Sequence, residues 1–101
     1  MLFAFILIDK PDHGDMRQRV RPVHKDYLAA VADRMAFAGP FTHDDGKTML
    51  GSLLVIDFPS RDAAHAWLAG EPFTKAGLYA STTIHAFLNL WPQKAGFPPA
   101  A

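Results

Sequence analysis

The apolar run at residues 2–8 is the sequence feature that most constrains the fold. It reads Leu-Phe-Ala-Phe-Ile-Leu-Ile and ends at the polar pair Asp9 and Lys10. A run this short, rich in aromatic and branched residues, is typical of a β-strand covered on both faces. The fold must therefore supply cover for two sides of a sheet.

The middle of the chain predicts two helices. Apolar residues at spacings of three and four over residues 20–35 indicate the first helix, with Pro22 in the first turn, where its missing N–H does no harm. A start near Met16 would place the proline inside the helix and kink it. The second helix is expected to begin after Ser60, a good N-cap, and to end at Gly70.

Three further strands are predicted from β-branched and apolar content and from the turns that bound them. They cover residues 37–42, 48–58 and 82–91. Residues 71–79 form a compact connector with room for one short helical turn. The order is β-α-β-β-α-β, the ferredoxin-like α+β arrangement. We expect one domain over residues 1–91, followed by a C-terminal tail, 92–101.

The predicted sheet is apolar on both faces, although two helices cover only one. In the last strand, Phe87 and Trp91 lie opposite the aliphatic row. Soluble monomers rarely expose an apolar surface of that size. We therefore expect a homodimer in which two sheets pack face to face.

Composition excludes several classes of function. Ten basic and ten acidic residues cancel and form no basic stripe, so we expect no nucleic-acid partner. The absence of cysteine excludes disulfides, thiolate-bound zinc and a thiol nucleophile. The apolar start is too short to span a membrane and lacks the basic region of a signal peptide, so we expect a cytoplasmic protein without a membrane partner. The five histidines and seven glycines form no metal or nucleotide motif, so no cofactor is expected.

His24 is the first candidate for chemistry, because it occupies the apolar stripe of the first helix. Its imidazole could act as a general acid or base near neutral pH. The alternative is a half-buried histidine with one hydrogen-bond partner. Glu71, at the mouth of the connector, could orient His24 if it came within hydrogen-bond reach; otherwise it is an exposed loop carboxylate.

Four further residues are candidates for holding a substrate. Arg21 could bind an anionic or phenolate oxygen through a forked hydrogen bond, and it is favoured over Arg17 and Arg19. All three arginines could instead be solvated or pair with nearby aspartates. Ser52 could direct a hydroxyl into a pocket or form only a local bond. In the connector, Phe73 and Tyr79 are candidate pocket walls.

These residues lie in short motifs that together resemble the YciI family. The motifs are Arg-Pro-Val-His at 21–24, Ala-Gly-Pro at 38–40, Gly-Ser at 51–52 and Glu-Pro-Phe-Thr-Lys-Ala-Gly-Leu-Tyr at 71–79. The resemblance runs from about Phe3 to Trp91 and implies a dimeric α+β barrel. It implies a histidine–aspartate site in which His24 matches the histidine. Glu71 stands where the family usually has aspartate, which changes the reach of the carboxylate.

The resemblance also implies a reaction class. Related barrels include muconolactone isomerases, and the wider group includes a dehydrochlorinase of chlorinated hydroxyhydroquinones. We therefore expect a small cofactor-independent lyase or isomerase for a small oxygenated ring-derived metabolite, with His24 and Glu71 at its centre. The alternatives are a non-catalytic dimeric module that binds a small ligand or regulates a partner and, less favoured, an oxygen-using monooxygenase.

Overall fold

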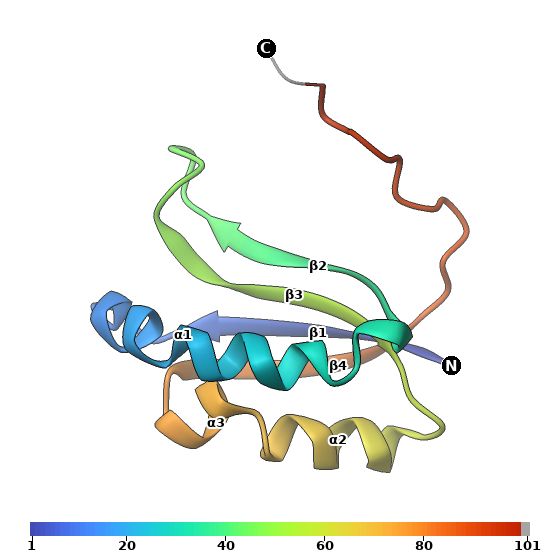
Figure 1. Cartoon of the computed structure of the whole chain (residues 1–101), viewed down its shortest axis with the longest axis horizontal. Coiled ribbons are helices and arrows are strands. Elements are labelled where there is room, and N and C mark those ends of the chain that lie inside the picture. The colour runs from blue at the N-terminus through green and yellow to red at the C-terminus, as the bar shows by residue number, and fades with distance from the viewer. Residues whose placement is uncertain (100–101) are drawn as a thin grey trace.

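The structure is a computed structural model that describes residues 1–99. Four strands and three α-helices follow one another along the chain, with the second strand leading directly into the third (Figure 1). The elements are β1 (Leu2–Asp9), α1 (Gly14–Ala29), the 3₁₀ turn η1 (Ala32–Arg34), β2 (Met35–Thr42), β3 (Met49–Asp57), α2 (Arg61–Ala69), α3 (Pro72–Ala76) and β4 (Tyr79–Phe87).

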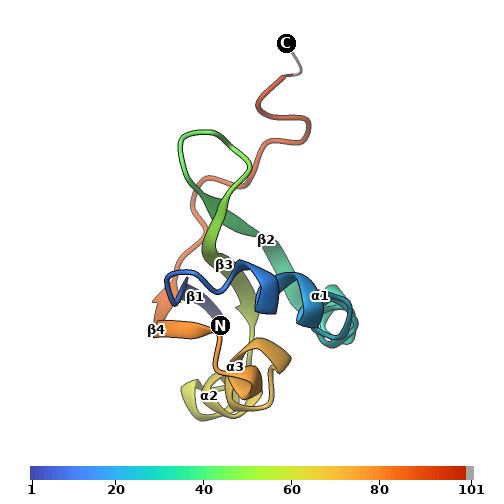
Figure 2. The same ribbon diagram turned by 90° about the vertical axis from the view of Figure 1, so that its left-hand side faces the viewer.

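The four strands form one antiparallel sheet in the order β2-β3-β1-β4. The three helices lie on one side of it, and the two views in Figures 1 and 2 agree on this. This architecture confirms the predicted ferredoxin-like α+β fold. The helix α3 is the predicted short turn of the connector.

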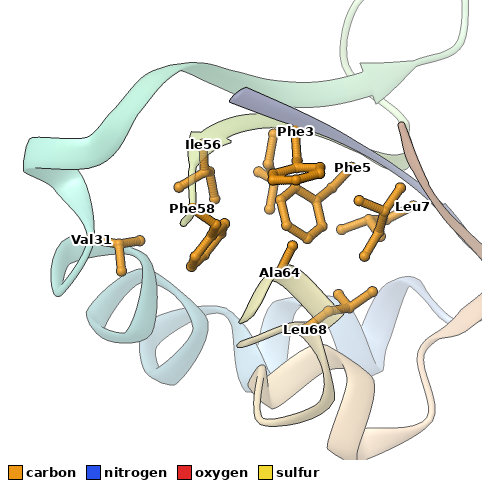
Figure 3. Packing of buried hydrophobic residues seen from close by; sticks show 10 residues of the cluster. Phe3, Phe5, Leu7, Val31, Ile56, Phe58, Ala64 and Leu68 are labelled. Carbon is orange, nitrogen blue, oxygen red and sulfur yellow. The ribbon is translucent and has the colours of Figure 1, made fainter. Parts of the chain in front are cut away.

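The core lies between the sheet and the helices (Figure 3). Because side chains alternate along a strand, Phe3, Phe5 and Leu7 of β1 all point to the helix side. Phe5 is fully buried, and its ring packs in T-shaped contacts with Phe58 and Trp67 at centroid distances of 6.0 and 5.4 Å. Burial of each such aromatic side chain contributes about 1.5–3 kcal/mol to folding, so this cluster fixes α1 and α2 against the sheet.

The start of α1 was predicted wrongly. The helix begins at Gly14, so Pro22 lies inside it and not in its first turn. A proline there removes one backbone hydrogen bond to the preceding turn. Pro22 and Gln18, which carries the carbonyl left without that partner, are both exposed, so the loss falls on the solvent side. The correction brings Arg17 into the helix.

The bounds of the last strand were also predicted wrongly. β4 covers Tyr79–Phe87 rather than 82–91, although the apolar alternation continues to Trp91. Phe87 pairs with Leu2, the first residue of β1, so no strand lies alongside the residues that follow. Residues 88–99 contain no helix or strand. The last two residues of the predicted tail, 100 and 101, lie outside the described residues.

The face of the sheet away from the helices is open in the single chain. By register, Ile6, Ile8, Phe37 and Phe87 share this face. Ile8 and Phe87 each expose 38% of their surface. The predicted homodimer would cover this face and stays a prediction. In residues 1–99, no helix has both the length and the apolar character needed to cross a membrane.

Candidate active site

His24 and Glu71, 47 positions apart in sequence, meet in a buried pair. Nδ1 of His24 lies 2.5 Å from Oε1 of Glu71. His24 comes from the middle of α1, and Glu71 is the N-cap of α3. His24 is 7% exposed and Glu71 is 0% exposed, so the pair is screened from bulk water.

The Glu71 carboxylate accepts two further hydrogen bonds. Oε1 accepts from the backbone N–H of Phe73 at 3.1 Å, and Oε2 accepts from the hydroxyl of Tyr79 at 3.0 Å. Burial raises the pKa of Tyr79 far above its ordinary value, and the negative charge of Glu71 and the hydrogen bond to it act in the same direction. Tyr79 therefore remains a neutral donor at physiological pH. These bonds compensate a buried carboxylate that would otherwise be costly.

Phe73 fixes the plane of the histidine ring. The two rings stack at a centroid distance of 4.0 Å and an angle of 17°. With Nδ1 held by Glu71, the other ring nitrogen, Nε2, has no hydrogen-bond partner within residues 1–99. Nε2 is not one of the fully buried atoms that lack a partner in residues 1–99, so it remains accessible to solvent.

The opening in front of His24 is a cleft of about 200 Å³ between α1 and strands β2 and β3. It is lined by Arg17, Arg21, His24, Lys25, Leu28, Ala38, Gly39, Pro40, Met49, Ser52 and Leu54. Its walls combine apolar side chains with a few polar groups, as ligand sites do, and its volume is below the roughly 300–1,000 Å³ of pockets for drug-sized ligands, so it suits only a smaller molecule. A wider hollow of about 770 Å³ includes open-face residues such as Ile6 and Phe41, but it contains neither member of the His24–Glu71 pair.

Arg17 is a site residue that the sequence reasoning passed over in favour of Arg21. It is 5% exposed and forms a two-pronged ion pair with Asp9, with Nε to Oδ2 at 2.7 Å and Nη2 to Oδ1 at 3.2 Å. Nη2 also donates to Ser52 Oγ at 3.0 Å. Arg17 precedes His24 by seven residues, which is two helical turns, so both fall on one face of α1. That spacing would have indicated Arg17 had the helix start been placed correctly.

The six predicted site residues fall into two groups. His24, Arg21 and Ser52 line the cleft, whereas Glu71, Phe73 and Tyr79 are absent from its lining and contact His24 or each other. Phe73 and Tyr79 thus support the pair and do not form the cleft wall. Within residues 1–99, no three histidine or acidic side chains come close enough together to hold a metal ion.

The sequence has relatives among known proteins. A family model described as the YCII-related domain matches residues 1–88. The protein YciI of Escherichia coli and that of Shigella flexneri are each 33% identical over 98 residues, which cover 90% of this chain and 100% of theirs. A protein of Haemophilus influenzae is 26% identical over the same lengths.

A solved structure is also similar. It is the 5-chloro-2-hydroxyhydroquinone dehydrochlorinase (TftG) of Burkholderia phenoliruptrix in complex with 2,5-dihydroxybenzoquinone. The TM-score is 0.81 at 33% identity, with 87% of this chain and 94% of that chain covered. The family match over nearly the whole domain confirms the resemblance inferred from the motifs: the chain belongs to the YCII-related family.

Proposed function

We propose that the chain is a small cofactor-independent enzyme, a lyase or isomerase, that performs His24-based acid–base chemistry on a small oxygenated ring compound. The observation that carries this proposal is the buried His24–Glu71 pair beside a cleft that His24 lines. A similar structure, TftG, is a dehydrochlorinase of a chlorinated hydroxyhydroquinone, which supports the substrate class.

His24 accepts and returns protons through Nε2, the nitrogen not held by Glu71. The Glu71 carboxylate keeps Nδ1 protonated and stabilises the imidazolium that forms when Nε2 takes a proton, as the carboxylate does in a serine-protease triad. Tyr79 and the Phe73 amide hold that carboxylate in place. The pair therefore acts as one preorganised base, and Glu71 serves as its positioning residue.

Dehydrochlorination needs only proton transfers. A proton moves from a ring hydroxyl to the carbon that carries chlorine, and loss of a second hydroxyl proton then expels chloride and leaves a quinone. The balance is one proton and one chloride lost, without an external oxidant. The first step is an isomerisation and the second an elimination, so one histidine serves both reaction classes.

Two cleft residues hold the ring in this scheme. Ser52 Oγ already accepts from Arg17, which leaves its own O–H free to donate to a substrate oxygen. The exposed side chain of Arg21 lines the same cleft and attracts a phenolate. Both orient the ring toward Nε2.

The test is turnover of a chlorinated hydroxyhydroquinone. Turnover is measured as chloride release and as deuterium uptake at the ring in heavy water. His24→Asn should lower the rate by about 10²–10⁴-fold while circular dichroism stays unchanged. His65→Asn, which alters an exposed histidine of α2, is the matched control and should retain the rate. Full turnover by the His24→Asn variant would refute the assigned role. Ligand binding by the wild type without turnover on any ring substrate would favour the non-catalytic module.

The proposal includes a homodimer closed through the open sheet face. Ile8 and Phe87 would be covered there, which removes apolar surface from water. Light scattering should give twice the mass of the chain, and Phe87→Lys should lower it toward that of one chain. A mass of one chain at all concentrations would disprove the dimer.

A further inference from the structure

The strongest unassigned feature of the cleft is the guanidinium of Arg17. Its Nε and Nη2 are occupied by the two oxygens of Asp9 and by Ser52. Within residues 1–99, the hydrogen-bond partner of the remaining nitrogen, Nη1, is the thioether sulfur of Met49, at 3.9 Å. A thioether is a weak acceptor, so one edge of a buried cation lacks a strong partner within residues 1–99.

The two residues that meet at that edge, Arg17 and Met49, are both part of the cleft, which His24 also lines. The guanidinium carbon lies 4.9 Å from the centroid of Phe73, the ring that also stacks on His24. The Phe73 ring therefore packs against both the Arg17 guanidinium and the His24 imidazole, and it holds the two groups at a fixed position relative to each other.

The charge around the cleft points to an anion. Arg17, Arg21 and Lys25 line it, and no carboxylate is among the lining residues. Asp9 contacts Arg17 without lining the cleft, and Asp26 lies in a neighbouring hollow shared with Arg21 and Lys25. The chain as a whole is neutral, so the excess positive charge is local to this opening.

We infer that Arg17 binds an ionised ring oxygen of the substrate through Nη1, and that the cleft selects small planar ring anions, either phenolates or the anions of hydroxyquinones. This inference rests on the proposed function and names the substrate class of the same site. Asp9 and Ser52 are positioning residues, because they take the other edge of the guanidinium and leave Nη1 directed at the ligand. The arginine edge gives a charge-assisted bond at one end of the ring while His24 acts at the other.

A pair of matched ligands separates charge from shape. The anion probe is 2,5-dihydroxybenzoquinone, whose hydroxyls are acidic because each is conjugated to a carbonyl. The neutral probe is 2,5-dimethoxybenzoquinone, which keeps the ring and carbonyls and cannot ionise. Calorimetry at neutral pH and low salt gives both dissociation constants without any need for turnover.

The informative variant is the double substitution Asp9→Asn with Arg17→Gln. It replaces the buried ion pair with two neutral amides, so neither partner is left as an unpaired buried charge and the net charge of the chain does not change. Ser52→Ala tests the positioning of Arg17 in a second way, because the cation stays. Arg19→Gln is the matched control, since Arg19 is exposed on the same helix and does not line the cleft.

We expect the double variant to bind the anion about 10–100-fold more weakly, the effect of losing one charged hydrogen bond, with the neutral probe affected less than threefold or so. Ser52→Ala should weaken binding of both probes, because it also removes the hydroxyl that donates to a ligand oxygen, and the loss should be larger for the anion. Arg19→Gln should bind both probes as the wild type does. Equal losses for both probes, or an unchanged anion preference in the folded double variant, would overturn the inference. His24→Asn should retain anion binding while it loses turnover, so failure of the anion site and failure of the proposed reaction are separate results.

Discussion

Glu71 offers a substitution that separates the charge of the site carboxylate from its reach. Glu71→Asp keeps the charge and withdraws the carboxylate by one carbon–carbon bond, roughly 1.5 Å. Its distance to Nδ1 of His24 would grow from 2.5 Å to roughly 4 Å, which is too long for a hydrogen bond. The bond to the Phe73 amide should persist, because aspartate is also a good N-cap.

The cost to stability follows from the same geometry. Glu71 is fully buried, so loss of a methylene costs about 1 kcal/mol in transfer and cavity terms. Leaving Nδ1 of His24 without its acceptor costs about 1–3 kcal/mol more. We expect urea denaturation to show a loss of about 2–4 kcal/mol with an unchanged m-value.

Glu71→Gln is the matched partner, because it keeps length and volume and removes the charge. Its hydrogen bonds weaken, yet the penalty of burying a charge also disappears, so the expected change in stability is only about 0–2 kcal/mol. Both variants should lose turnover, since neither places an anion within hydrogen-bond distance of Nδ1. A Glu71→Asp variant within about 0.5 kcal/mol of the wild type would refute the packing of the pair described above.

Three other perturbations give distinct readouts. Gly51→Ala would place a Cβ 2.0 Å from the carbonyl oxygen of Leu7, so we expect a loss of about 1–3 kcal/mol or more by urea denaturation. Tyr79→Phe should make the free energy of unfolding fall less steeply at alkaline pH. The pKa of Tyr79 is raised in the folded state, so the stability that its hydroxyl contributes is present below the unfolded pKa of about 10 and is lost as pH rises above it. An equally steep fall in both proteins would contradict this. Hydrogen bonds from the β2–β3 turn lower the pKa of Asp45 to about 2. The stability that Asp45 contributes is present above its unfolded pKa of about 4 and is lost as pH falls toward 2, so Asp45→Ala should weaken the acid dependence between those values.

The element order was accessible from sequence because it depends on local patterns. The cap at Ser60 is an example, since its side chain accepts from the Ala63 amide as predicted. Glu71 as the partner of His24 was expected from the family resemblance, since the two residues are 47 positions apart and no local pattern joins them. The end of β4 was not accessible, because it is set by where β1 begins. Apolar alternation through Trp91 carries no information about the length of a strand 80 residues away in sequence.

The missed role of Arg17 has a local cause. Reading Pro22 as a first-turn residue placed Arg17 in a loop, where arginines are normally solvated. In the actual helix, Arg17 and His24 are its two buried residues. Arg17 also depends on Asp9 at the end of β1, a tertiary contact that spacing along a helix does not reveal.

The capping role of Glu71 makes the backbone a reporter of the site. The amide of Phe73 donates to the same oxygen that contacts His24, so that hydrogen cannot exchange with solvent unless α3 opens or the carboxylate moves. The rate at which this amide exchanges with deuterium therefore reports whether the His24–Glu71 pair is intact. It can be measured at this single residue and without a substrate. Slower exchange at this one amide would identify a ligand that tightens the site, even among compounds that the protein does not convert.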